Sequence, residues 1–146
     1  DKQLIKHEEI FFRLEADYHV DNIDKKAIAT YTPSEKKSFI VNNYHYPSLA
    51  EYIGQFPVIL IAPNDTDLIR EGSEERRRFF DTLLCQIDKS YLQKLSEYNR
   101  ILKQRNALLT HFKEQKSINT TLLEVYDEQL LPLMEFICTA RNNLLS

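Results

Sequence analysis

Residues 88–116 read DKSYLQKLSEYNRILKQRNALLTHFKEQK, and their pattern predicts one long helix. Large side chains recur at alternating spacings of four and three residues, which is typical of a helix that packs against another helix along one seam. Asp88 stands where it can cap the first turn. The seam residues are Tyr91, Leu95, Tyr98, Leu102, Arg105, Leu109 and Phe112.

A second seam of the same kind occupies residues 120–146. A capping box, Thr121-Leu122-Leu123-Glu124, predicts that this helix begins close to residue 121. Only a short polar loop separates the two seams, so an antiparallel helical hairpin is expected. Pro132 lies inside the second helix and should kink it. The seam residues here are Leu123, Tyr126, Leu130, Leu133, Ile137, Ala140 and Leu144.

A third helix is predicted directly before the hairpin, where residues 72–81 read GSEERRRFFD. Ser73 is its expected N-cap, and Glu74 and Glu75 follow in the first turn, where the helix dipole favours anions. One apolar stripe then marks the face that should pack. It consists of Phe79, Phe80, Leu83, Leu84 and Ile87.

The first part of the chain predicts β-structure instead. Apolar and polar residues alternate from Phe11 to Val20, which is the period of a half-buried strand. Further strands are expected at Lys26–Tyr31 and Ser38–Val41, and a continuous apolar run at Phe56–Ala62 predicts a strand that is buried on both faces. The first three strands should form an antiparallel meander.

These patterns together predict an α+β chain in two parts. Residues 1–64 form the β-rich part, and residues 65–146 form an all-helical arm that contains the hairpin, 88–116 and 120–146. No apolar run reaches the roughly 18 residues that a membrane span needs, so no membrane association is expected. Cys85 and Cys138 lie in apolar helical sequence, away from any metal-ligand spacing, and are expected to be buried thiols.

Charge is distributed unevenly along the 146 residues. The net charge of −3 argues against a generally basic nucleic-acid-binding protein. Residues 70–116, however, hold 11 Lys and Arg against 7 Asp and Glu, and this local excess of positive charge suggests an anionic partner.

The arginines leave two interpretations open. Arg105 is the one charged residue of the first seam, so we expect a carboxylate partner, Glu128 or Asp81. Consecutive helical residues point about 100° apart, so Arg76, Arg77 and Arg78 cannot all face one ligand. A structural network would comprise Arg76, Asp81, Arg105 and Glu128. A surface for DNA or a partner protein would comprise Arg70, Arg77, Arg78 and Lys103.

Several segments of this sequence, in this order and spacing, are similar to one known family. The RRRFFD and LKQRN blocks are the most specific of them. The chain resembles the RecF family of bacterial recombination mediators over nearly its whole length, and residues 1–45 show the weakest similarity. The matching segments are Tyr52–Gln55, Ala62–Asp65, Leu68–Gly72, Ser73–Asp81, Tyr91–Tyr98, Leu102–Leu109 and Tyr126–Leu130.

The resemblance implies an ABC-type ATPase related to SMC proteins. Such a protein has an ATP-binding lobe I and a helical arm, lobe II, and it binds ATP with Mg as well as DNA. It forms a homodimer when ATP binds, and it acts with RecO and RecR to load RecA at single-strand gaps in DNA repair, replication restart and the SOS response. A cytoplasmic location is implied, and residues 1–64 would belong to the ATPase lobe.

The motifs of such an ATPase are missing from this chain. Its only glycines, Gly54 and Gly72, do not belong to a phosphate-binding GxxGxGK[ST] loop, and no signature or Walker B motif is present. The resemblance places these motifs upstream and downstream, so the chain is expected to be a central fragment. We therefore predict no catalytic, cofactor-binding or metal-binding residues in it and no ATP hydrolysis by it alone. The alternative is a helical-hairpin module for protein interaction or dimerisation, without direct DNA contact.

Overall fold

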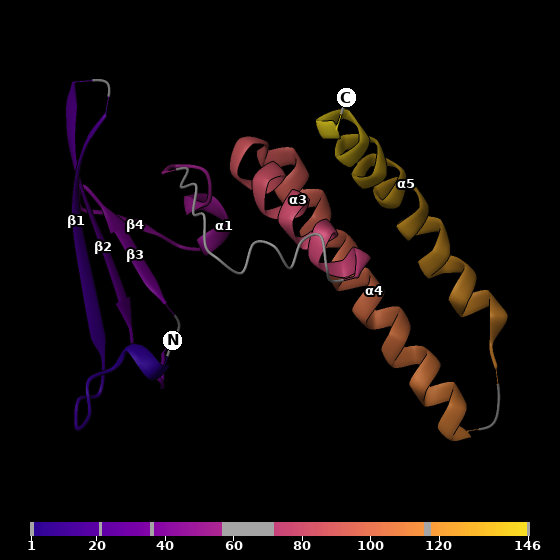
Figure 1. Cartoon of the computed structure of the whole chain (residues 1–146). Coiled ribbons are helices and arrows are strands. Elements are labelled where there is room, and N and C mark those ends of the chain that lie inside the picture. The colour runs from indigo at the N-terminus through magenta and orange to yellow at the C-terminus, as the bar shows by residue number, and fades with distance from the viewer. Residues whose placement is uncertain (1, 21, 36, 57–71, 116–117, 146) are drawn as a thin grey trace. The chain divides into compact units, whose positions relative to one another are not determined.

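The structure of the protein is a computed structural model that describes all residues except 1, 21, 36, 57–71, 116–117 and 146 (Figure 1). It confirms the α+β class, with strands first and helices after them. The chain divides into two compact units, Asp1–Ile53 and Gly54–Ser146. The expected boundary at residues 64 and 65, and nearly all of the expected strand at 56–62, lie outside the described residues.

The first unit is a four-stranded antiparallel sheet with the strands in chain order, as the meander prediction required (Figure 1). A 3-10 turn, Lys2–Leu4, precedes it. The long first hairpin pairs Phe12 with Tyr31, and shorter strands extend the sheet on one side. The strands are β1 (Phe12–Val20), β2 (Ile23–Tyr31), β3 (Ser38–Val41) and β4 (Tyr44–Tyr46).

Aromatic side chains cover part of one face of this sheet. The short helix α1 (Leu49–Tyr52) follows β4 and ends before Gly54, whose φ of 85° is a conformation that glycine adopts without strain. The last residue of α1, Tyr52, stacks on Phe39 with ring centroids 4.9 Å apart, and its ring meets that of Tyr46 edge-on. Burial raises the pKa of the Tyr52 hydroxyl. Helix α1 is thus attached to the sheet by aromatic packing.

Two asparagines make the tight turn between β3 and β4. Asn42 and Asn43 both have positive φ, 46° and 67°, as the two-residue turns that suit twisted hairpins require. The Asn42 amide also accepts a hydrogen bond from the backbone N–H of Lys26 at 2.8 Å and donates one to the carbonyl of Asp24 at 3.3 Å. Its side chain therefore continues the hydrogen bonding of β2 beyond the end of β3.

The described residues of the second unit form three helices, and the predicted hairpin is confirmed. Figure 1 shows the two long helices, α4 and α5, side by side. Asp88 caps the first of them as expected, because its Oδ1 accepts the backbone N–H groups of Ser90 and Tyr91. The helices are α3 (Ser73–Ile87), α4 (Lys89–Gln115) and α5 (Thr120–Leu145).

The predicted N-cap of α3 was wrong by one residue, whereas α5 begins at Thr120, where its predicted range begins. Gly72, not Ser73, occupies the N-cap position of α3, and the Ser73 hydroxyl instead accepts a hydrogen bond from Arg77. At α5, the carboxamide of Asn119 accepts the N–H of Leu122, so the first turn is capped before the Thr121 capping box begins. Helix ends are the least certain part of any sequence pattern because several polar residues there can cap equally well.

The helical core follows the predicted seams along most of their length. Leu84 from α3, Tyr91 from α4 and Ile137 from α5 form one buried cluster, and Ile101 packs with Leu130 and Leu133 in a second one. Leu92 and Ile101 are buried although they lie outside the predicted seam. Helix α3 packs on both other helices, so the buried surface is wider than a two-helix seam.

Other predicted apolar positions are exposed. Phe79 and Ile87 of the α3 stripe and Leu109 of the α4 seam keep much of their surface accessible. Cys85 is half-buried, and burial raises the pKa of its thiol, but Cys138 is exposed and its predicted burial was wrong. Among the described residues, no helix is both long enough and apolar enough to cross a membrane.

We expect Asn42→Ala to destabilise the sheet unit by about 1–2 kcal/mol, because the change removes two hydrogen bonds and leaves alanine at positive φ. Hydrogen exchange measured by NMR should show that the Lys26 amide loses protection. Asn43→Gly is the matched control, since glycine suits its φ of 67°, and it should leave that amide protected. Unchanged protection in Asn42→Ala would contradict this role of the Asn42 side chain.

Candidate functional site

One carboxylate connects helices α3, α4 and α5. Asp81 on α3 accepts the hydroxyl of Tyr91 on α4 at 2.6 Å, and it pairs with Arg141 on α5 through two hydrogen bonds of 2.8 and 2.9 Å. The side chains of Asp81 and Arg141 are only 20% and 21% exposed. A paired arrangement of this kind satisfies both charged groups in a largely desolvated place. Asp81 was predicted to be structural, and it makes these contacts between the helices.

Tyr91 is the most deeply buried member of this network, with 0% of its surface exposed. Burial raises the pKa of its hydroxyl above the usual value, and the negative charge of Asp81 raises it further. For Arg141, burial works to lower the pKa, but the hydrogen bond and charge of Asp81 raise it overall. Tyr91 is therefore a neutral donor and Arg141 a permanent cation at neutral pH.

Arg105 makes the second link between helices, and its predicted partners were wrong. Its Nε donates to Oδ1 of Asp127 at 2.6 Å, and Nη2 donates to Oδ2 at 3.4 Å. The hydrogen bond to Asp127 raises the pKa of Arg105. Glu128 is exposed because it lies one residue further round α5, and Asp81 is already occupied by Arg141. The expectation that Arg105 is paired was right, but the carboxylate belongs to Asp127.

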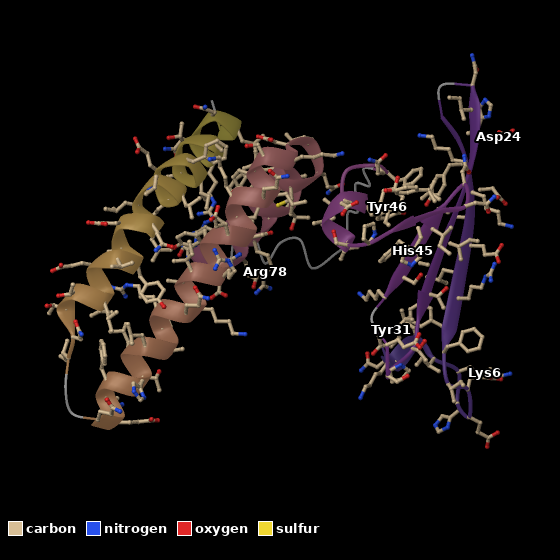
Figure 2. The ribbon with its side chains drawn as sticks, turned by 180° about the vertical axis from the view of Figure 1, so that it is seen from behind. Lys6, Asp24, Tyr31, His45, Tyr46 and Arg78 are labelled. Atoms are coloured by element: carbon tan, nitrogen blue, oxygen red, sulfur yellow. The ribbon has the colours of Figure 1, made fainter. Side chains whose placement is uncertain are left out.

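The arginines of α3 lie on its exposed surface in different surroundings. Arg78 contacts Glu75 at 3.0 Å and Glu74 at 3.7 Å, and Figure 2 shows its side chain on the outside of the helical unit. Arg77 is exposed and hydrogen-bonds to Ser73, and Arg76 is exposed as well. Arg77 and Arg78 therefore have different partners, Ser73 for the first and Glu74 with Glu75 for the second.

Of the other residues predicted to contact DNA or a partner, the structure describes Lys103 and Arg77 but not Arg70. Lys103 is exposed on α4, and within the described part of the chain neither Lys103 nor Arg77 forms an ion pair. Arg70 lies outside the described residues. The exposed cations thus remain candidates for an anionic ligand, whereas Arg105 and Arg141 hold helices together.

A shallow apolar groove of about 400 Å³ runs between α4 and α5. The Arg105–Asp127 pair stands in its wall, and the other lining side chains are apolar apart from the tyrosine hydroxyl. Leu131 and Met134 are 59% and 45% exposed within it. The rest of the lining is Tyr98, Leu102 and Leu130.

Two features of the chain bear on nucleotide and metal binding, one in the sequence and one in the described part of the structure. Its two glycines stand outside any Gly-Lys-Ser or Gly-Lys-Thr sequence, so a phosphate-binding loop cannot be built from them. In the described ranges, no group of three or more His, Cys, Asp or Glu side chains is close enough to hold a metal ion. Neither ATP nor Mg can be assigned to particular residues here.

Sequence reasoning missed two residues of the helix-linking network, Arg141 and Asp127. Arg141 is the one cation after residue 117, and it stands in an otherwise apolar helix. That isolation was a usable signal, since a lone charge in an apolar surrounding needs a partner. Asp127 gave a weaker signal, because it is one of two adjacent carboxylates.

The chain has the architecture of an antiparallel sheet unit followed by a helical hairpin arm, and solved structures share it. It matches a structure described as the recombination mediator protein RecF with ATP in the RecFOR pathway, with a TM-score of 0.90, 33% identity, and coverage of 99% of this chain and 39% of that one. A second structure, of the same mediator with ATPrS, gives a TM-score of 0.91.

The chain belongs to the RecF family. A protein of Cytophaga hutchinsonii described as DNA replication and repair protein RecF is 46% identical over 111 residues, which are 76% of this chain and 29% of that protein. Its counterpart in Bacteroides fragilis is 35% identical over 147 residues, or all of this chain and 39% of that protein. No family model matches the chain. The chain spans about a third of the length of these curated relatives.

We expect Asp81→Asn to lower the free energy of unfolding by about 3 kcal/mol, because the change leaves the Arg141 guanidinium without its partner in a largely desolvated place. Asp127→Asn is the matched change. It should lower the free energy of unfolding by a clearly smaller amount, because Asp127 is 47% exposed and water can take the place of its carboxylate beside Arg105. Urea denaturation followed by circular dichroism measures both. Equal losses would contradict the central position of Asp81.

The Tyr91 hydroxyl should make stability depend on alkaline pH. Its pKa is raised in the folded state, so the stability it contributes is fully present below the unfolded-state value near 10.0 and is lost as the pH rises above it. At pH 7, Tyr91→Phe should cost about 2 kcal/mol, the value of a hydrogen bond to a charged acceptor. Urea denaturation at pH 7 and at about pH 11 should show the difference between the two proteins shrinking at the higher pH. A difference that does not change with pH would be the contrary result.

Proposed function

We propose that the chain is the part of a RecF-type recombination mediator that comprises the β-rich end of the ATPase lobe, residues 1–64, and the helical arm, residues 65–146. The whole protein would bind ATP with Mg, dimerise on ATP, and bind DNA at single-strand gaps in the cytoplasm. Together with RecO and RecR it would promote RecA loading in DNA repair, replication restart and the SOS response. Family membership and the shared fold support this proposal.

Within this chain, DNA contact is assigned to exposed cations of the arm. The observation that carries this assignment is that Arg77 and Lys103 are exposed and, among the described residues, take part in no ion pair. Exposed cations without a carboxylate partner can replace the counterions of a phosphate backbone. Arg78 would contribute less, since Glu74 and Glu75 already compete for it. Arg70 completes the proposed set.

Contact of this kind is independent of base sequence. Lys and Arg on a helix surface meet phosphates, whereas base reading needs side chains inserted into a groove. The arm would then strengthen binding to gapped DNA that the whole protein recognises, and it would do so mainly at low ionic strength.

A second function is favoured by a different observation. The groove between α4 and α5 exposes apolar side chains that no described residue covers, and such a surface suits a protein partner better than a phosphate backbone. The hairpin could thus act in protein interaction or dimerisation without contacting DNA itself.

A salt titration separates the two functions. We expect the chain to bind gapped DNA with an affinity that falls steeply as salt rises, and Arg77→Glu or Lys103→Glu should each weaken binding and reduce the slope by about one or two. Fluorescence anisotropy with labelled gapped DNA measures this. Lys113→Glu, near the end of α4, makes the same change in net charge and is the matched control. If all three variants behave alike, the effect is one of net charge alone and the assignment of DNA contact to Arg77 and Lys103 fails.

A further inference from the structure

Helix α5 carries a second apolar stripe beside the one that forms the core. Leu130, Leu133 and Ile137 face the hairpin seam and are buried. Leu131 and Met134 are exposed, and Cys138 continues their spacing of three and four residues. Helix α5 packs on both α4 and α3, yet Leu131 and Met134 of the second stripe stay exposed among the described residues.

The second stripe forms part of a continuous depression. The groove between α4 and α5 shares Leu131 and Met134 with a neighbouring hollow of about 390 Å³, which reaches past Pro132 to Cys138. Side chains of Met and Cys are soft and adapt to partners of different shape. The hollow is lined by α5 alone, whereas the groove is lined by α4 and α5 together, and an apolar groove between two helices is the kind of surface on which an amphipathic helix docks.

One rim of this depression is acidic. Glu124, Glu128 and Glu135 follow one another at helical spacings of four and seven residues, which places them in a row next to the stripe. All three are exposed, and within the described residues none of them is paired with a cation. On the α4 side the groove is lined by Tyr98, Leu102 and Arg105, and Arg105 is already paired with Asp127.

This charge distribution selects the occupant. If two copies of the chain met at a two-fold axis through Met134, the Glu135 side chains of the two copies would lie close together. Their negative charges would repel each other, which disfavours a second copy as the occupant. A nucleic acid would be repelled by the same row. We propose that the groove between α4 and α5 is a docking site for a basic amphipathic helix of a partner protein, with apolar residues over Leu131 and Met134 and cations against Glu128 and Glu135.

The site is independent of the proposed DNA contact. It uses α5 and the facing side of α4, whereas the DNA contact depends on Arg77 and Lys103. Substitution of those two cations should leave docking of the helix unchanged, so the two proposals can fail separately.

The test uses a designed helical peptide of about 18 residues, long enough to form about five turns, with leucines at heptad spacing flanked by Lys and Arg. The control peptide keeps the leucines and replaces each Lys and Arg with Glu. Fluorescence anisotropy with the whole chain should show saturable 1:1 binding of the basic peptide that is at least about tenfold tighter than that of the acidic one. Equal binding of both peptides would overturn the proposal.

Variants of the groove make the test specific. Met134→Ser and Leu131→Ser should each weaken binding of the basic peptide about tenfold, the effect expected of a central contact residue. Val125→Ser is the matched control, since Val125 is 48% exposed but lies about 180° from Met134 round α5. This variant should bind the basic peptide as tightly as the unchanged chain does. Circular dichroism checks that each variant is folded. An equal loss in Val125→Ser would overturn the assignment.

The acidic row is tested by Glu128→Gln with Glu135→Gln. This double change should lower the affinity of the chain for the basic peptide and make that affinity depend less on salt, because two ion pairs are lost. Unchanged affinity and salt dependence would show that charge does not select the occupant. Displacement of the peptide by duplex DNA, or a dimer in sedimentation that Leu131→Ser dissociates, would overturn the proposal in favour of DNA or a second copy.

Discussion

The three-way contact of Asp81 with Tyr91 and Arg141 is the interaction on which the helical unit depends. It joins α3 to both helices of the hairpin at the place where the buried cluster of Leu84, Tyr91 and Ile137 lies. Apolar packing alone allows a helix to slide or rotate, whereas a carboxylate with three donors at fixed distances does not. The orientation of α3, and with it the direction of the arginines on its outer surface, follows from this contact.

The same contact explains why the arginines divide into two groups. Arg141 and Arg105 each have a carboxylate on a neighbouring helix, and both lie where the helices meet. Arg76, Arg77 and Arg78 belong to the first two turns of α3, and their side chains are exposed. Position relative to the helix contacts thus separates the arginines that link two helices from those on the outer surface of α3.

The sequence was sufficient for the order of the elements and for the hairpin, because both depend on periodicity that each helix carries by itself. It was not sufficient for burial where a third element contributes. Leu84 of α3 lies in one buried cluster with Tyr91 of α4 and Ile137 of α5, and the pattern within α4 alone does not predict that contact. The Asn42-Asn43 turn was predictable in principle, since asparagine tolerates positive φ, although its side-chain bonds to β2 were not.

For the candidate site, chemistry was predictable and geometry was not. A guanidinium in an apolar seam needs a carboxylate, which the seam pattern alone implied for Arg105. Adjacent residues on a helix differ by about 100°, however, so the choice between Asp127 and Glu128 depends on the rotation of α5, which only the packed structure fixes. The apolar groove was likewise invisible in the sequence, because its lining alternates between two helices.

The two ion pairs also give the arm a mechanical property. Arg105–Asp127 and Asp81–Arg141 are bonded to residues 14 positions apart on α5, and sliding α5 along its neighbours by one turn would break both pairs together. Helix α5 has 26 residues and is therefore roughly 39 Å long. The two pairs lie on either side of Pro132, so both segments of α5 that this proline separates are held to a neighbouring helix by an ion pair.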